Sequence, residues 1–248
     1  NVDAVAKRLE GIDAARLWGP REAMTPSHVP QSLMVIGAGA IGMEFASFYR
    51  ALGAQVTVVE ARDEVLPGED HEVGAFVRAA FEADGVRVLT GCTVAEIGNH
   101  GGGVRALVRR AGVDLDAGRD VVRGPSGVPG RDPGSEQGNE ASIVVDADRV
   151  LVSVGVTGNV EHLGLERTAV GVERGFIVCD PFGATAQPGV HAAGDVAGPP
   201  WLAHAASHQA VACIERIAGV NGAHAPRVDR IPGAIFCVPQ VASVGLTE

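Results

Sequence analysis

The chain has 248 residues, of which 46% are hydrophobic and 20% charged, so it can bury one large core or two modest ones. Its formal net charge of −10, with no Lys/Arg cluster, argues against a nucleic-acid-binding surface. No apolar run reaches membrane-spanning length. The sequence also shows no secretory signal, which would have a basic start followed by an apolar core. We therefore expect neither nucleic acid nor a membrane among its partners.

Cysteine usage points to a reducing compartment. The four cysteines, Cys92, Cys179, Cys213 and Cys237, form no C-x-x-C pair and no zinc-type spacing. We predict buried thiols in a cytoplasmic protein. The chain begins with Asn1 rather than Met, which we interpret as a processed product or a part of something longer.

The first part of the chain alternates strands with amphipathic helices. Residues 1–30 contain a short helical pattern and three prolines in a polar stretch, and we interpret them as a connector. Short apolar runs then predict strands, and apolar residues at helical spacing predict helices. In chain order these are a strand at 33–36, a helix at 41–52, a strand at 56–59, a helix at 73–81 and a strand at 86–89. Two successive βαβ units predict a parallel sheet with right-handed crossovers.

A G-x-G-x-x-G motif lies between the first strand and the first helix. Gly37 permits a tight turn, Gly39 lets the backbone approach a pyrophosphate, and Gly42 lets helix and strand pack closely. The second strand ends at Glu60, about where an acid accepts hydrogen bonds from a ribose 2′-OH. A carboxylate repels a 2′-phosphate, so NAD is favoured over NADP. A tight strand–helix turn beside a solvated acid is the weaker alternative.

The pattern changes after the third strand. Short runs at 92–97, 104–108 and 143–145 have no helices between them and predict an antiparallel meander. Residues 112–140 are rich in Gly, Pro, Asp and Ser, and we interpret them as a mobile insertion, a surface insert rather than a binding loop. A buried strand at 150–155 closes this domain.

A second unit is expected after Gly155. Residues 176–178 predict a short strand, 189–195 a strand ending in a glycine and an acid, and 202–217 a long helix. A further segment begins near residue 231.

Five stretches taken together resemble the FAD-dependent pyridine-nucleotide–disulfide oxidoreductases, and most closely their dihydrolipoamide-oxidising branch. They are REAM at 21–24, GAGAIGMEFASFYRALGAQVTVVE at 37–60, VLVSVGVTGN at 150–159, GVHAAGDVAGPPWLAH at 189–204 and IPGAIFCVPQVASVGLTE at 231–248. The resemblance implies an α/β fold, in which a Rossmann-like NAD-binding domain with a parallel sheet and an antiparallel β-meander precedes the second half of an FAD-binding domain. It also implies the domain boundaries: a connector at 1–30, the NAD-binding domain at 31–155, FAD-binding residues at 156–228 and the start of a dimer-interface domain at 229–248.

The resemblance also assigns site residues by position. Those matching the NAD site, with Glu44 near the nicotinamide–flavin junction, are Gly37, Ala38, Gly39, Ala40, Ile41, Gly42, Glu44, Glu60, Val94 and Gly155. Those matching the FAD site are Gly194, Asp195, Trp201, Leu202, Ala203 and His204. His204 and His208 have metal-ligand spacing on the predicted helix, but the neighbouring sequence offers no third ligand, so we expect no metal site.

The resemblance to the dihydrolipoamide-oxidising branch implies a reaction for its complete enzymes: dihydrolipoamide reduces an active-site disulfide, the disulfide reduces FAD, and FAD passes a hydride to NAD+. The resemblance further implies a homodimer and, as a partner, the lipoamide-bearing acyltransferase of a 2-oxo-acid dehydrogenase complex. This chain has no C-x-x-x-x-C redox pair, no first flavin fingerprint and no catalytic His–Glu pair. We therefore expect a complete NAD site, an FAD site that needs another segment, and no complete catalytic set.

Two other interpretations stay open. The chain could belong to another disulfide reductase of the same family, although Glu60 argues against the NADPH-using members. It could also be a non-catalytic NAD-binding module, which the missing thiols favour.

Overall fold

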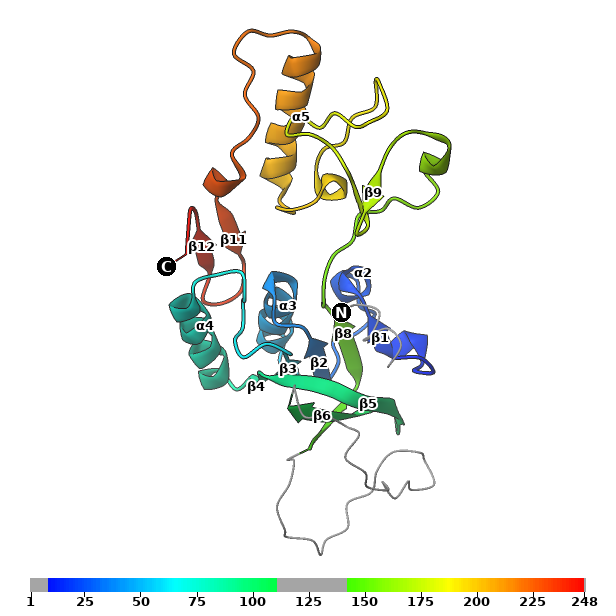
Figure 1. Ribbon diagram of the computed structural model, residues 1–248. Helices are drawn as coiled ribbons and strands as arrows, with labels where there is room; N and C mark the ends of the chain where they lie inside the picture. Colours follow the sequence, from blue (N-terminus) through cyan, green and yellow to red (C-terminus); the bar gives the residue numbers. More distant parts are fainter. Residues whose placement is uncertain (1–8, 111–141, 248) are drawn as a thin grey trace, which may run out of the picture. The chain divides into compact units, whose positions relative to one another are not determined.

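The computed structural model describes residues 9–110 and 142–247 (Figure 1). The chain divides into two compact units. The first comprises Asn1–Gly155 together with Ile235–Val241, and the second Val156–Ala234 with Ala242–Glu248. The predicted insertion at 112–140 lies outside the described residues.

A five-stranded parallel sheet forms the centre of the first unit. Its strands lie in the order β1-β8-β2-β3-β4, and every neighbouring pair is parallel. Their bounds are Leu17–Trp18 (β1), Ser32–Ile36 (β2), Gln55–Val59 (β3), Arg87–Leu89 (β4) and Arg149–Val152 (β8). The parallel sheet predicted from the βαβ pattern is confirmed.

Both faces of this sheet are buried, because successive side chains of a strand point to opposite faces. On β2, Leu33 and Val35 pack into a core with the helices α3 (Ala40–Ala51) and α4 (His71–Ala83). Met34 and Ile36 pack on the other side, against an antiparallel sheet. Helices, parallel sheet and antiparallel sheet therefore form three layers, which Figure 1 shows around β2 and β3.

The antiparallel layer has three strands in the order β5-β6-β7. They run over Cys92–His100, Gly103–Arg110 and Ile143–Ala147. Arg105 on β6 faces Asp146 on β7, and the two side chains form a bidentate ion pair with N–O distances of 2.6 and 2.8 Å. The predicted meander is confirmed.

Part of the predicted connector belongs to the parallel sheet instead. β1 pairs with β8, and the short helix α2 (Pro20–Met24) follows it. The Tyr49 hydroxyl of α3 donates to the Ala23 carbonyl at 2.6 Å, and both residues are buried. A two-residue strand has too little periodicity to be recognised, so the sequence pattern missed it.

The second unit is built around α5 (Ala203–Ile217). A small antiparallel pair, β9 (Val172–Glu173) and β10 (Phe176–Ile177), precedes it, and the predicted long helix is confirmed. The strand predicted at 189–195 is wrong, since only one isolated bridge, Ala184 to His191, forms there. A strand needs a neighbour to accept its hydrogen bonds, and the described residues supply no more than this bridge.

The remaining elements are short. β11 and β12 form a two-stranded sheet. Their bounds, and those of the 3-10 helices, are Gly233–Ile235 (β11), Val241–Ser243 (β12), Ala14–Arg16 (η1), Leu165–Arg167 (η2), Asp195–Ala197 (η3) and Val228–Arg230 (η4).

Candidate functional site: a glycine turn at the start of α3

The turn between β2 and α3 requires glycine at two of its three motif positions. Gly37 has φ +104, and a Cβ there would lie 2.5 Å from the Ser153 carbonyl oxygen. A Cβ on Gly42 would lie 2.0 Å from the carbonyl oxygen of Gly37. The Ser153 hydroxyl donates to the carbonyls of Ile36 and Gly37 at 3.0 and 3.1 Å, which fixes the turn against the end of β8. Gly37 and Gly42 are therefore explained by packing alone.

Gly39 is different, because nothing lies within 4 Å of a Cβ built on it. It is the N-cap of α3 and has an ordinary extended backbone, with φ −73. The N–H groups of the first helical turn, at Ala40, Ile41 and Gly42, have no acceptor within the helix, and the helix dipole makes this end positive. The open side of Gly39 thus provides the space, the donors and the charge that a pyrophosphate needs.

Glu60 follows β3 and closes the turn from the other side. Its Oε2 accepts a hydrogen bond from the Ala38 N–H at 2.7 Å, and its Oε1 accepts one from the Arg62 N–H at 2.8 Å. Each carboxylate oxygen can accept a further bond. Glu60 therefore fixes the turn and retains acceptor capacity for ribose hydroxyls. The sequence identified the acid but not its contact with Ala38.

Glu44 and Ser47 on α3 bind a distant segment of the chain. Glu44 Oε1 accepts from the Phe236 N–H at 2.8 Å, and Ser47 Oγ accepts from the Val238 N–H at 3.0 Å. Sequence reasoning missed both contacts, since these partners are 192 and 191 positions apart and share no motif.

The other two residues assigned to NAD occupy contrasting environments. Val94 on β5 is 6% exposed and belongs to the core beneath the antiparallel sheet. Gly155 follows β8, is exposed and has φ +144. Their contacts with NAD stay predictions.

The residues assigned to FAD lie in the second unit. The Gly194 N–H donates to Gln209 Oε1 at 2.7 Å, a partner on α5 that the sequence did not indicate. Asp195 opens η3 and is exposed. Trp201 is 41% exposed and stacks on Phe176, with ring centroids 5.8 Å apart.

The last three residues assigned to FAD lie at the start of α5. Leu202 is its N-cap and Ala203 its first residue. His204 Nε2 lies 2.8 Å from the Pro232 carbonyl oxygen. Their contacts with FAD, like those of Gly194, Asp195 and Trp201, stay predictions.

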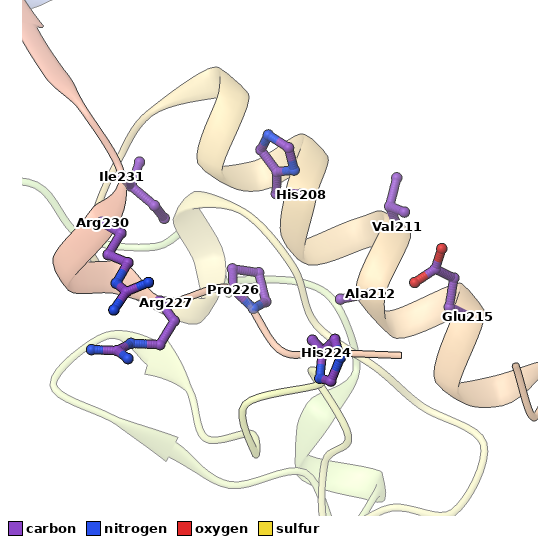
Figure 2. A pocket seen from close by; sticks show the side chains of 9 residues that line it. All are labelled: His208, Val211, Ala212, Glu215, His224, Pro226, Arg227, Arg230 and Ile231. Atoms are coloured by element: carbon purple, nitrogen blue, oxygen red, sulfur yellow. The ribbon is translucent and has the colours of Figure 1, made fainter. Parts of the chain in front are cut away.

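A separate cavity of about 310 Å³ lies further along α5. Figure 2 shows His208 and Glu215 on the helix, with Arg227 and Arg230 on the segment that follows it. None of the residues assigned to NAD or FAD lines this cavity. Within the described part of the chain, no three His, Cys, Asp or Glu side chains gather closely enough to hold a metal ion.

The thiols of the chain are all free. Burial raises the pKa of the Cys179 and Cys237 thiols, and the Glu44 carboxylate adds to the effect at Cys237. A raised pKa disfavours the thiolate, which is the nucleophilic form. Neither cysteine has the environment of a redox-active thiol.

Comparison with known proteins places this geometry in a family. Residues 6–210 match the family model described as pyridine nucleotide-disulphide oxidoreductase. The chain belongs to that family. Its members are flavoprotein oxidoreductases that use FAD and a pyridine nucleotide, as the sequence resemblance indicated.

The chain is also similar to individual proteins. It is 41% identical over 244 residues to a dihydrolipoyl dehydrogenase from Rhizobium etli, covering 98% of this chain and 45% of that protein. A dihydrolipoyl dehydrogenase from Zymomonas mobilis is 39% identical over 247 residues, covering 99% of this chain and 47% of that protein. The chain thus spans about half the length of the curated relatives it matches.

Solved structures agree on the fold. The crystal structure of LpdA from Mycobacterium tuberculosis superposes with a TM-score of 0.73 at 27% identity, covering 93% of this chain and 43% of that one. The flavoprotein disulfide reductase RclA from Escherichia coli gives a TM-score of 0.74 at 21% identity, covering 94% and 46%. Both confirm the predicted fold class. No helix among the described residues has the length and apolarity needed to cross a membrane.

Proposed function

We propose that this chain is the NAD(H)-binding portion of a dihydrolipoyl dehydrogenase. The observation that carries the proposal is the open side of Gly39, bordered by the first turn of α3 and by Glu60. The similarity to dihydrolipoyl dehydrogenases over almost the whole chain supports the choice of enzyme.

The chain's own residues would bind and orient the dinucleotide. The N–H groups of Ala40, Ile41 and Gly42 would donate to the pyrophosphate, and Glu60 would accept from the adenosine ribose. Bound there, NAD+ supplies a hydride acceptor for a reduced flavin. Asp195 and residues 201–204 would contribute part of the flavin site in a protein that also carries the family's first flavin segment.

Glu60 supports NAD rather than NADP. Its carboxylate is already fixed by the N–H groups of Ala38 and Arg62, so it cannot easily turn away from the ribose. A 2′-phosphate placed beside it would bring two negative charges together at a partly buried position.

A binding experiment tests this proposal directly. Titration of the 248-residue chain with NADH and NADPH, followed by nucleotide fluorescence, should give the tighter dissociation constant for NADH. Glu60→Ala should weaken NADH binding by about 1–3 kcal/mol, because charge-assisted hydrogen bonds are lost. Glu72→Ala, an exposed acid on α4, serves as the matched control and should bind like the parent. Tighter binding of NADPH would refute the role of Glu60.

A non-catalytic NAD-binding module is the second candidate, because the open side of Gly39 and the fixed Glu60 provide for binding of a dinucleotide without the flavin residues. Dye reduction by NADH separates the two. The dehydrogenase proposal expects activity only when the chain is joined to a polypeptide carrying the family's flavin and disulfide segment. A chain that binds NADH but stays inactive in that fusion would favour the module.

A further inference from the structure

A short segment near the carboxyl end belongs to the nucleotide-binding unit. Ile235–Val241, here called the strap, is part of the first compact unit although the residues on either side of it belong to the second. Its side chains alternate: Ile235 and Cys237 are 6% and 0% exposed, whereas Phe236 and Val238 are 72% and 76% exposed. One face of the strap is therefore buried.

The buried face of the strap lies in the same core as the sheet and α3. Ile235, Cys237 and Val241 join the cluster that contains Met43 and Ala46. The backbone of the strap is fixed as well, since the Phe236 and Val238 N–H groups donate to Glu44 and Ser47. The Cys237 thiol donates to the Pro239 carbonyl at 3.1 Å.

Glu44 and Ser47, which bind the strap, lie on α3, the helix whose first turn faces the open side of Gly39. Glu44 and Ser47 are the fifth and eighth residues of α3, so they lie three positions apart on one side of the helix, and the neighbouring Met43 and Ala46 pack in the core. Removing the strap would expose part of the core beside α3 and free two N–H groups. The strap therefore contributes packing and hydrogen bonds to the side of α3 that carries Glu44 and Ser47.

We propose that Ser47 is a positioning residue for nucleotide binding: it docks the strap on α3, and the docked strap holds α3 in the geometry that binds NADH. The inference rests on the proposed function, because it concerns the same site. Linkage requires the coupling to be reciprocal, so NADH must in turn strengthen docking of the strap.

Cys237 is a built-in reporter of docking, because its thiol is fully buried while the strap is bound. In a background of Cys92→Ala, Cys179→Ser and Cys213→Ala, it is the one remaining thiol of the chain. Its labelling by 5,5′-dithiobis(2-nitrobenzoate) in excess measures how often the strap opens. Binding of NADH is measured on the same protein by fluorescence.

Ser47→Ala removes one acceptor and should speed labelling of Cys237 by roughly two- to tenfold, as expected for one hydrogen bond. Saturating NADH should slow labelling of the parent at least about fivefold. Ser47→Thr, which keeps the hydroxyl, should restore slow labelling. Ser207→Ala, which removes a hydroxyl bonded within α5, is the matched control and should label like the parent.

The outcomes separate the inference from the proposed function. Absence of NADH binding would overturn both. Two results would overturn the inference alone. In the first, NADH binds but does not slow the labelling of Cys237. In the second, the Ser47→Ala protein has the same rate of Cys237 labelling and the same affinity for NADH as the parent. Slower labelling with NADH, together with faster labelling and weaker NADH binding in Ser47→Ala, supports the coupling.

Discussion

At the scale of single residues, the three motif glycines have separable roles. Gly37 and Gly42 are required by contacts within the protein, with Cβ positions 2.5 and 2.0 Å from carbonyl oxygens. Gly39 has no such contact within 4 Å, so the fold itself does not explain it. In the proposed NAD site, close approach of the pyrophosphate to this backbone would account for Gly39.

Substitutions at Gly39 and Gly42 should therefore have opposite effects. Gly39→Ala should leave the free energy of unfolding nearly unchanged and weaken NADH binding at least about tenfold, because its methyl group occupies the space for the pyrophosphate. Gly42→Ala should lower the free energy of unfolding by about 1–3 kcal/mol through overpacking. Urea unfolding and NADH titration of both variants measure this. An unstable Gly39→Ala protein would contradict the assignment.

At the scale of elements, α3 connects the parts of the first unit. Its buried face packs on the sheet, its first turn forms the candidate site, and Tyr49 in its last turn bonds to Ala23 of α2. Tyr49 also contacts Trp18 of β1, with ring centroids 5.7 Å apart. Tyr49 therefore holds β1 and α2 against α3.

Loss of the Tyr49 hydroxyl should weaken this docking. Tyr49→Phe keeps the ring but leaves the buried Ala23 carbonyl without its donor, which should cost about 1–2 kcal/mol of unfolding free energy. Faster hydrogen exchange over residues 17–24 should accompany the loss. Unchanged exchange there would show that β1 and α2 are held by other contacts.

Burial of Tyr49 also predicts a pH dependence. It raises the pKa of Tyr49 above its usual value of 10.0, so the folded state keeps the proton when the unfolded state has lost it. The contribution of Tyr49 to stability is thus complete below pH 10 and falls as the pH rises further. Tyr49 is the single tyrosine of the chain, so absorbance titration of phenolate formation reads its pKa directly. Tyr49→Phe should remove this part of the alkaline stability loss.

At the scale of the whole molecule, the chain consists of two units that differ in how fully their apolar side chains are buried. The first has three layers around a sheet that is buried on both faces. In the second, Val211, Ile214 and Ile217 of α5 are 56%, 63% and 56% exposed. The candidate NAD site lies within the first unit, so its ligand should stabilise that unit selectively.

The two tryptophans report on the two units separately, since Trp18 lies in the first and Trp201 in the second. In Trp201→Phe, NADH at about 100 times its dissociation constant should add about 2.7 kcal/mol and raise the melting temperature seen by Trp18 by about 5–10 °C. In Trp18→Phe, the transition seen by Trp201 should stay unchanged. An equal shift of both would show that the units unfold as one.

Local patterns in the sequence predicted the nucleotide-binding fold of the first unit and most residues of its candidate site. Short apolar runs and helical spacing predicted β2–β4, α3–α5 and the antiparallel layer, and the glycine spacing with Glu60 indicated a dinucleotide. These signals are readable because each depends on residues close together in the chain. Only the tertiary structure decided what depends on distant partners: the pairing of β1 with β8, the failure of 189–195 to form a strand, and the strap on α3. Such contacts join segments that are far apart in the sequence and share no local pattern. They form and contribute to stability only when the chain folds, so the sequence pattern does not predict them.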